Sequence, residues 1–147
     1  MGLKRFLRKN TSNTQDPLFQ LVKSITGFSP VDLSLYRRVF THTSMEKTNA
    51  EGQKINYERL EFLGDAVLNT IVTAHLFESL PQNNEGSLTL MRSKIVRRDF
   101  LNKVGKQLSL IDQLSSNVPI KNYSQHVHGN LFEALVGALY IDLGFER

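Results

Sequence analysis

Three carboxylates stand at helical spacing in an otherwise apolar segment, NYERLEFLGDAVL, at residues 56–68. Offsets of three and seven residues return to the same side of a helix, so Glu58, Glu61 and Asp65 share one face. An ionised carboxylate buried without a partner normally takes up a proton, pairs with a base or coordinates a cation. Arg59 points about 100° away from its neighbour and cannot cover the whole cluster. The segment therefore predicts a bound metal ion.

A second segment near the end of the chain, VHGNLFEALVGALYIDL, repeats this arrangement. Its only polar groups near the middle are Asn130 and Glu133, which lie one helical turn apart among large apolar residues. If the two helices face each other, Glu61, Asp65, Asn130 and Glu133 line one small space. Oxygen ligands without Cys or His suit Mg²⁺, Mn²⁺ or Ca²⁺, so we expect a hard divalent cation there.

The elements that must position these residues are all predicted to be helices. Helix start and stop signals recur along the chain, among them Asp16 with Pro17, Gly27, Asn56, Pro81 and Ser87. No strand-like alternation of useful length occurs. The expected helices span about 17–26, 32–40, 56–80, 88–108 and 127–143, with a short helix and a loop over 109–124. We predict an all-α single domain in which both acidic helices are buried on most sides.

The composition agrees with a single domain. The chain has 147 residues, 40% of them hydrophobic, and no cysteine, which excludes disulfides and thiolate metal sites. Residues 1–15 are basic and then polar and predict an N-terminal arm before a domain over 16–147. No apolar run of signal-peptide or membrane-spanning length occurs, so we expect a soluble, cytoplasmic protein without a membrane partner.

The formal net charge of +4 makes a polyanionic partner plausible. The helix expected over 88–108 carries six cations against a single acid, Asp99, and the cations include Arg92, Lys94, Arg97 and Arg98. A solvated helix face is one explanation of this pattern, and contact with RNA phosphates is the other.

The two acidic segments are part of a longer pattern that resembles the ribonuclease III family. ERLEFLGDA at 58–66 is close to the family signature, and similarity extends through THTS at 41–44, EGSLTLMRSKIV at 85–96 and FEALVGALYID at 132–142. The resemblance implies an all-helical endonuclease domain that forms a two-fold homodimer. It also implies Mg²⁺-dependent cleavage of both strands of double-stranded RNA, with Mn²⁺ as a substitute, in ribosomal and other RNA processing.

The same resemblance suggests a role for each matching residue. Glu61, Asp65, Asn130 and Glu133 would form the metal site, with Asp65 and Glu133 as the catalytic pair. Glu58 and Glu85 match acidic positions that support the site or contact RNA, although an acid in the first helical turn, as at Glu58, also simply favours the helix dipole. Phe62 matches an aromatic position that inserts into the partner subunit.

One site residue departs from the family pattern, which normally has Asp where this chain has Asn130. Asparagine keeps a carbonyl oxygen but loses the charge and adds an amide donor. Three carboxylates and one amide carry a formal charge of −3, where four carboxylates would carry −4. Loss of a supporting partner typically weakens metal binding about 10–100-fold. We therefore expect a raised metal requirement, unless Asn130 is a structural amide without metal contact.

Three other functions remain open at this stage. The first is a family member that has lost catalysis and acts as an RNA-binding or ribosome-associated scaffold. The second is a di-iron carboxylate bundle, which the missing Glu-x-x-His pairs disfavour. The third is a helical DNA-binding module, in which buried acids would have no role. No part of the chain resembles the double-stranded-RNA-binding domain that family members often carry, and we expect the chain to be a piece of a longer protein.

Overall fold

The computed structural model describes residues 14–145 and confirms the all-helical prediction. Most of the predicted N-terminal arm, up to Asn13, lies outside the described residues. Within 14–145 there is no strand, only two isolated bridges. The helices are α1 Pro17–Thr26, α2 Leu33–Val39, α3 Glu58–Ser79, α4 Glu85–Ile95, α5 Arg98–Gln107 and α6 Val127–Leu143, with 3₁₀ turns at Thr43–Met45, Leu110–Gln113 and Ile120–Asn122.

Several helix ends follow from local sequence signals. Asp16 accepts a hydrogen bond from the Leu18 N–H (2.9 Å) at the start of α1, and Gly27 ends that helix with a φ of 77°. The N-cap of α3 is Tyr57, one residue after the predicted Asn56, although Asn56 Oδ1 accepts from the Glu58 N–H (3.0 Å), the first amide of the helix. That helix, α3, ends just before Pro81, as predicted.

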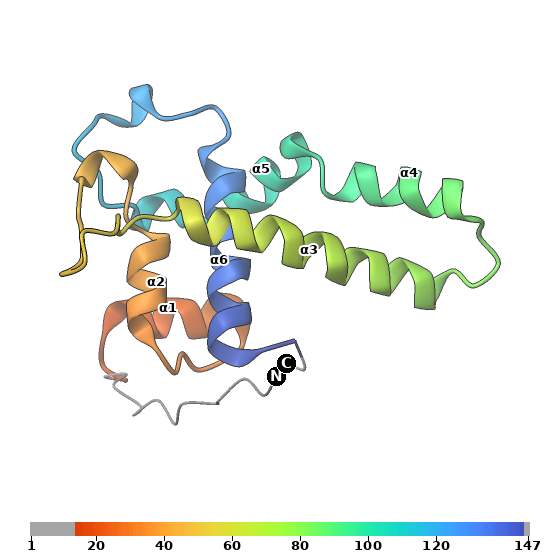
Figure 1. Ribbon diagram of the computed structural model, residues 1–147, viewed down its shortest axis with the longest axis horizontal. Coiled ribbons are helices and arrows are strands. Elements are labelled where there is room, and N and C mark those ends of the chain that lie inside the picture. The colour runs from red at the N-terminus through yellow and green to blue at the C-terminus, as the bar shows by residue number, and fades with distance from the viewer. Residues whose placement is uncertain (1–13, 146–147) are drawn as a thin grey trace.

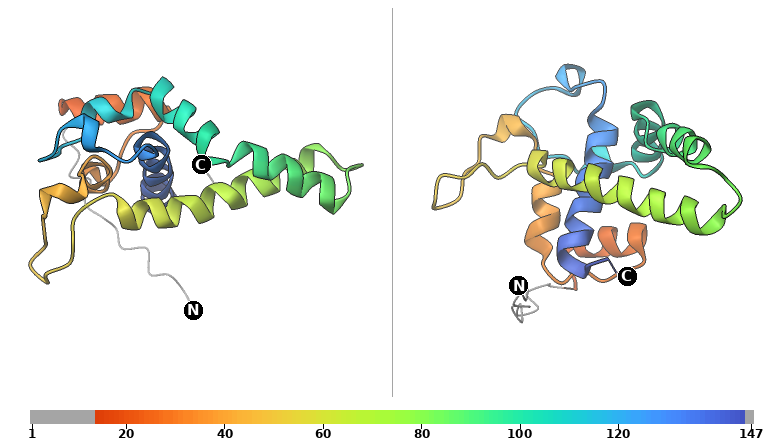
Figure 2. Two further views of the ribbon diagram at one scale, coloured as in Figure 1. Left: turned by 90° about the horizontal axis from the view of Figure 1, so that it is seen from above. Right: turned by 45° about the vertical axis from the view of Figure 1, so that its right-hand side comes forward.

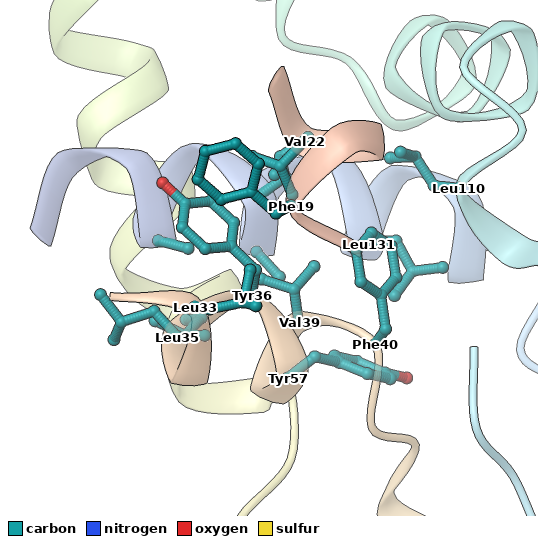
Figure 3. Packing of buried hydrophobic residues seen from close by; sticks show 14 of the residues in the cluster. Phe19, Val22, Leu33, Leu35, Tyr36, Val39, Phe40, Tyr57, Leu110 and Leu131 are labelled. Carbon is teal, nitrogen blue, oxygen red and sulfur yellow. The ribbon is translucent and has the colours of Figure 1, made fainter. Parts of the chain in front are cut away.

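The hydrophobic core lies where α1 packs on α2 and α2 packs on α6 (Figure 3). Tyr36, Val39, Leu131 and Leu110 are essentially inaccessible to solvent. The end of α6 is attached to the start of α2 through Asp142. Its carboxylate accepts from the N–H groups of Val31 (2.9 Å) and Asp32 (2.8 Å) and from the Tyr36 hydroxyl (2.9 Å).

The loop that contains THTS packs on the loop before α6. His42 stacks on Tyr123 with ring centroids 5.0 Å apart, and its Nδ1 lies 2.8 Å from the Ser44 hydroxyl. The His42 N–H donates to the Ser115 carbonyl (2.9 Å). The motif therefore stabilises the junction of two loops next to the start of α3.

The prediction of one helix over 88–108, capped by Ser87, is wrong. Two helices, α4 and α5, meet at Val96 and Arg97, and Arg97 is extended with a ψ of 146°. The cap of α4 is Asn84, whose Oδ1 accepts from the Ser87 N–H (2.9 Å). The break allows α4 to lie along α3 while α5 packs on α6.

The prediction that both acidic helices are buried holds for α6 and is wrong for α3. The first part of α3 crosses α6, and the rest extends with α4 as an arm away from the body (Figures 1 and 2). Phe62 is 83% exposed and Phe77 is 71% exposed. By length and composition alone, α3 is long and apolar enough to span a membrane, and only 22% of its apolar 18-residue stretch is buried. Its exposed apolar side needs an explanation.

Candidate active site

Residues of α3, α5 and α6 line a cleft of about 330 Å³ where the three helices meet. The cleft is lined by all four predicted metal-site residues: Glu61 and Asp65 from α3, and Asn130 and Glu133 from α6. The structure therefore brings together two segments that are far apart in the sequence. At about 30 Å³ per water molecule, the cleft has room for a hydrated cation and a phosphate group.

Glycines set the spacing between the helices that carry the acids. A Cβ atom on Gly64 would lie 1.7 Å from the Glu133 carbonyl oxygen, and one on Gly137 would lie 2.2 Å from the Leu60 carbonyl oxygen. On the other side of α6, a Cβ on Gly129 would lie 3.2 Å from Asn102 Oδ1. Glycine at these positions therefore permits close helix packing. The α3 and α6 backbones can touch only because Gly64 and Gly137 have no side chains.

The electrostatics of the cleft reflect crowded negative charge. Burial, together with the nearby Asp65 and Glu61 carboxylates, raises the pKa of Glu133 to about 7. Burial and the neighbouring Glu58 carboxylate also raise the pKa of Glu61. The Arg98 guanidinium opposes both shifts, and no other Lys or Arg of the described residues lines the cleft. The half-buried acids thus have too little positive charge around them.

Asp65 and Asn130 are each oriented by a neighbouring side chain. Asn69, one turn further along α3, donates through Nδ2 to Asp65 Oδ1 (3.0 Å). Burial raises the pKa of Tyr57, and a hydrogen bond from the Asn130 side chain opposes that rise. An amide that donates through its nitrogen keeps its carbonyl oxygen for another partner.

Of the remaining predicted site residues, Phe62 and Arg98 line the cleft and the others lie outside it. Glu58 raises the pKa of Glu61, and its own carboxylate accepts from the Asn56 side chain at 3.4 Å. Glu85 begins α4 and accepts from the Thr89 hydroxyl, at 2.9 Å. Arg92 donates to the Thr73 hydroxyl, at 3.2 Å, on the arm. Of the four predicted basic residues, which are Arg92, Lys94, Arg97 and Arg98, only Arg98 reaches the cleft.

The donor set of the cleft fits a hard divalent cation. Three carboxylates and a carbonyl oxygen are the ligands that Mg²⁺ and Mn²⁺ take, and a cation would offset the charge that raises the pKa of Glu133. Within residues 14–145, no three acidic or histidine side chains are already close enough together to hold an ion. The carboxylates would therefore have to rotate toward it.

Residues 58–144, which include α3 and α6 and hence the whole cleft, match the Ribonuclease III domain. The chain belongs to the ribonuclease III family. The Ribonuclease 3 of Flavobacterium psychrophilum is 48% identical over 143 residues, or 97% of this chain and 58% of that protein. The Ribonuclease 3 of Zunongwangia profunda is 46% identical over 146 residues, or 99% of this chain and 60% of that protein. The chain thus spans about three fifths of the length of these curated relatives.

A solved structure of the family has the same fold. The nuclease domain of ribonuclease III from Campylobacter jejuni superimposes with a TM-score of 0.74 at 28% identity, covering 91% of this chain and 89% of that one. That structure is described as having a flexible region involved in dimer formation. The ribonuclease III fold is therefore established for this chain.

Among the residues that line the cleft of this ribonuclease III domain, sequence reasoning missed two with polar side chains. They are Asn102, which belongs to α5, and His126, which is the residue before α6. Neither stands in a recognisable motif, and the position of Asn102 on α5 follows the break between α4 and α5. That break carries no Gly or Pro, so no local signal indicated where Asn102 would lie.

Proposed function

We propose that this chain is the nuclease part of a metal-dependent, cytoplasmic endoribonuclease that hydrolyses phosphodiester bonds in double-stranded RNA. The observation that supports this most directly is the shared cleft of Glu61, Asp65, Asn130 and Glu133, which come from two separate helices. Three carboxylates faced by a single cationic side chain, Arg98, do not form balanced ion pairs, and this arrangement suits a reaction at a phosphate held by a cation.

Glu61, Asp65 and Glu133 would hold Mg²⁺, or Mn²⁺ in its place, through their carboxylates, and Asn130 through its carbonyl oxygen. When bound, such a cation lowers the pKa of water and offsets charge on the phosphate. Asp65 is the most exposed of the acids, and we assign it the orientation and deprotonation of the attacking water. Glu133 would hold the ion close to Asp65, and the Arg98 guanidinium would contact the phosphate oxygens.

Double-stranded RNA suits this site because A-form duplexes are recognised through phosphates and shape with little base reading. We propose that Arg92, Lys94 and Arg97 contact the backbone beyond the cleft, with Glu58 and Glu85 in supporting or RNA-contacting roles. Maturation of ribosomal RNA and processing of other structured RNAs are the proposed cellular roles.

We also propose that the chain acts as a homodimer through the exposed side of α3. Phe62 and Phe77 on this helix are more than two thirds exposed, which a partner's surface would relieve. A two-fold dimer places two identical clefts along one RNA duplex, and each would cut one strand.

Two observations favour a second candidate, a catalytically weakened RNA-binding scaffold. Asn130 reduces the charge of the site, and among the described residues no acidic cluster is preassembled for metal. The retained Glu61, Asp65 and Glu133 favour the enzyme over this candidate.

Cleavage of a long RNA duplex by the purified chain distinguishes the two functions. We expect cutting in Mg²⁺ or Mn²⁺, none in chelator, and a loss of at least about 100-fold for Glu133→Gln. Glu78→Gln is the matched control, since Glu78 is an exposed acid of α3 outside the cleft. Binding without cutting in every metal condition would support the scaffold instead.

A further inference from the structure

The helix that carries Asn130 and Glu133 begins without a cap from its own side chains. His126 precedes α6 and makes no side-chain cap bond, and the first turn of α6 contains no acidic residue. The amide groups of a first helical turn have no partners within the helix, so they need another acceptor. For Gly129, directly before Asn130, this acceptor comes from a different helix.

Asn102 of α5 supplies an acceptor for the first turn of α6 and also binds the loop just before that helix. Its Oδ1 accepts from the Gly129 N–H (2.8 Å), and its Nδ2 donates to the Gln125 carbonyl (3.1 Å). The second Nδ2 hydrogen faces His126 Nδ1 at 3.4 Å. An amide accepts on its oxygen and donates from its nitrogen, whereas an ionised Asp only accepts and a Leu does neither.

The contact between α5 and α6 is close on either side of this cap. A Cβ on Gly105 would lie 2.1 Å from the His128 carbonyl oxygen, and one on Gly129 would lie 3.3 Å from the Asn102 backbone nitrogen. Asn102 therefore acts on a backbone segment that has little freedom to move elsewhere. It also lines the same cleft as the four metal-site residues.

We propose that Asn102 is a positioning residue of the metal site. By bonding Gln125 and Gly129, it holds the first turn of α6 so that Asn130 and Glu133 face Glu61 and Asp65. The inference rests on the proposed function, because it requires that the cleft bind a divalent cation. It assigns Asn102 no contact with RNA or with the ion.

Asn102→Asp separates positioning from charge. The variant keeps an acceptor for the Gly129 N–H but turns an oxygen toward the Gln125 carbonyl, so the cap is broken on one side. It also adds negative charge at the cleft, which by itself would tighten cation binding. A positioning role of Asn102 predicts the opposite result, namely that Asn102→Asp binds the cation more weakly.

The test measures Mn²⁺ binding to the whole chain without RNA, from the EPR signal of free Mn²⁺. We expect the Kd to rise about tenfold for Asn102→Ala and for Asn102→Asp, within the range found for residues that orient metal ligands. Asn49→Ala is the control, because Asn49 also accepts backbone N–H bonds, from Glu51 (3.1 Å) and Gln53 (2.8 Å), outside the cleft. Its Kd should stay unchanged even if its melting temperature falls.

The outcomes distinguish the two proposals. Unchanged or tighter Mn²⁺ binding by Asn102→Asp, with normal binding by Asn102→Ala, would overturn the positioning role and leave the proposed function intact. Absence of Mn²⁺ binding by the unaltered chain would overturn the proposed function, and the role of Asn102 with it. If Asn102→Ala does not fold, the Asp variant alone decides, because it keeps the volume and the Gly129 bond.

Discussion

Gly64 lies directly against the main-chain carbonyl of Glu133, so close that a Cβ on the glycine would sit 1.7 Å from that oxygen. Gly137 makes the reciprocal contact with the Leu60 carbonyl, at 2.2 Å. Glu61 and Asp65 flank one of these contacts in sequence, and Glu133 forms part of it. The separation of the acids across the cleft is therefore set by backbone contact.

Gly64→Ala should destabilise the fold by at least about 3 kcal/mol, because the added methyl group overlaps backbone that cannot turn aside. Urea denaturation of the unaltered chain and of Gly64→Ala measures the difference in their free energies of unfolding. Gly86→Ala in α4 is the control, since the nearest atom to its Cβ would be 3.7 Å away. That variant should be unchanged or more stable by up to about 1 kcal/mol. Equal effects of the two substitutions would contradict the close contact.

The metal-free chain should lose stability as the pH rises from 5 to 8. The pKa of Glu133 is about 7 in the folded chain and 4.5 in its ordinary state, because of burial and of the Asp65 and Glu61 carboxylates. Between these values the folded state binds more protons than the unfolded state, so the free energy of unfolding falls with rising pH. Urea denaturation in the presence of a chelator, repeated at each pH, gives the slope of the free energy of unfolding against pH.

Glu133→Gln should flatten this slope, whereas Glu78→Gln should leave it in place. The comparison of variants matters because burial lowers the pKa of His42 and His128, and each contributes an opposite trend below pH 6.5. An identical slope for the unaltered chain and Glu133→Gln would show that Glu133 does not titrate in this range.

Asn130→Asp should lower the metal concentration needed for half-maximal binding and cleavage by about tenfold. The substitution restores a fourth carboxylate, and the Tyr57 hydroxyl can donate to it in place of accepting from the amide. Titrations with Mn²⁺ and Mg²⁺ test this directly. An unchanged or raised requirement would mean that Asn130 is not a ligand.

Asp142→Ala should cost about 3 kcal/mol of stability, because it leaves two backbone N–H groups and the Tyr36 hydroxyl without their acceptor. Tyr36→Phe removes one of the three bonds and should cost about 1 kcal/mol. Mn²⁺ affinity should be the same in both variants, since Asp142 lies outside the cleft lining. Asp112→Ala, at an exposed acid, is the control and should leave the urea midpoint unchanged.

Phe62→Ala should weaken the proposed dimer at least about tenfold while leaving the fold intact, because the ring is 83% exposed in a single chain. Sedimentation equilibrium gives the dimer Kd. Ile120→Ala is matched to it as an apolar residue that is 69% exposed but lies away from α3. A dimer equally stable in both variants would place the interface elsewhere.

The parts of the fold that the sequence predicted correctly have local causes. Asp16, Pro17 and Gly27 delimit α1, Pro81 follows α3, and the apolar run Val127–Leu143 is α6 in full. The acidic spacing on α3 and α6 likewise needed only helical periodicity to predict a shared cleft.

The errors come from tertiary packing that has no local signal. The chain turns at Val96 and Arg97 without Gly or Pro because α4 packs on α3 and α5 packs on α6. An apolar position such as Phe62 has the same sequence pattern whether it faces a core or a partner. Asn102 could be recognised only once α5 was seen beside the start of α6.

The glycine contacts have a consequence for the choice of cation. Since the two helices cannot approach further along the line joining Gly64 and Glu133, the shorter bonds of a smaller ion must come from side-chain torsions alone. Mg²⁺ takes its oxygens at about 2.0–2.1 Å and Ca²⁺ at about 2.3–2.6 Å, with more ligands around it. Two short-chain groups, Asp65 and Asn130, have few torsions with which to adapt, so discrimination between these ions depends on the longer glutamates.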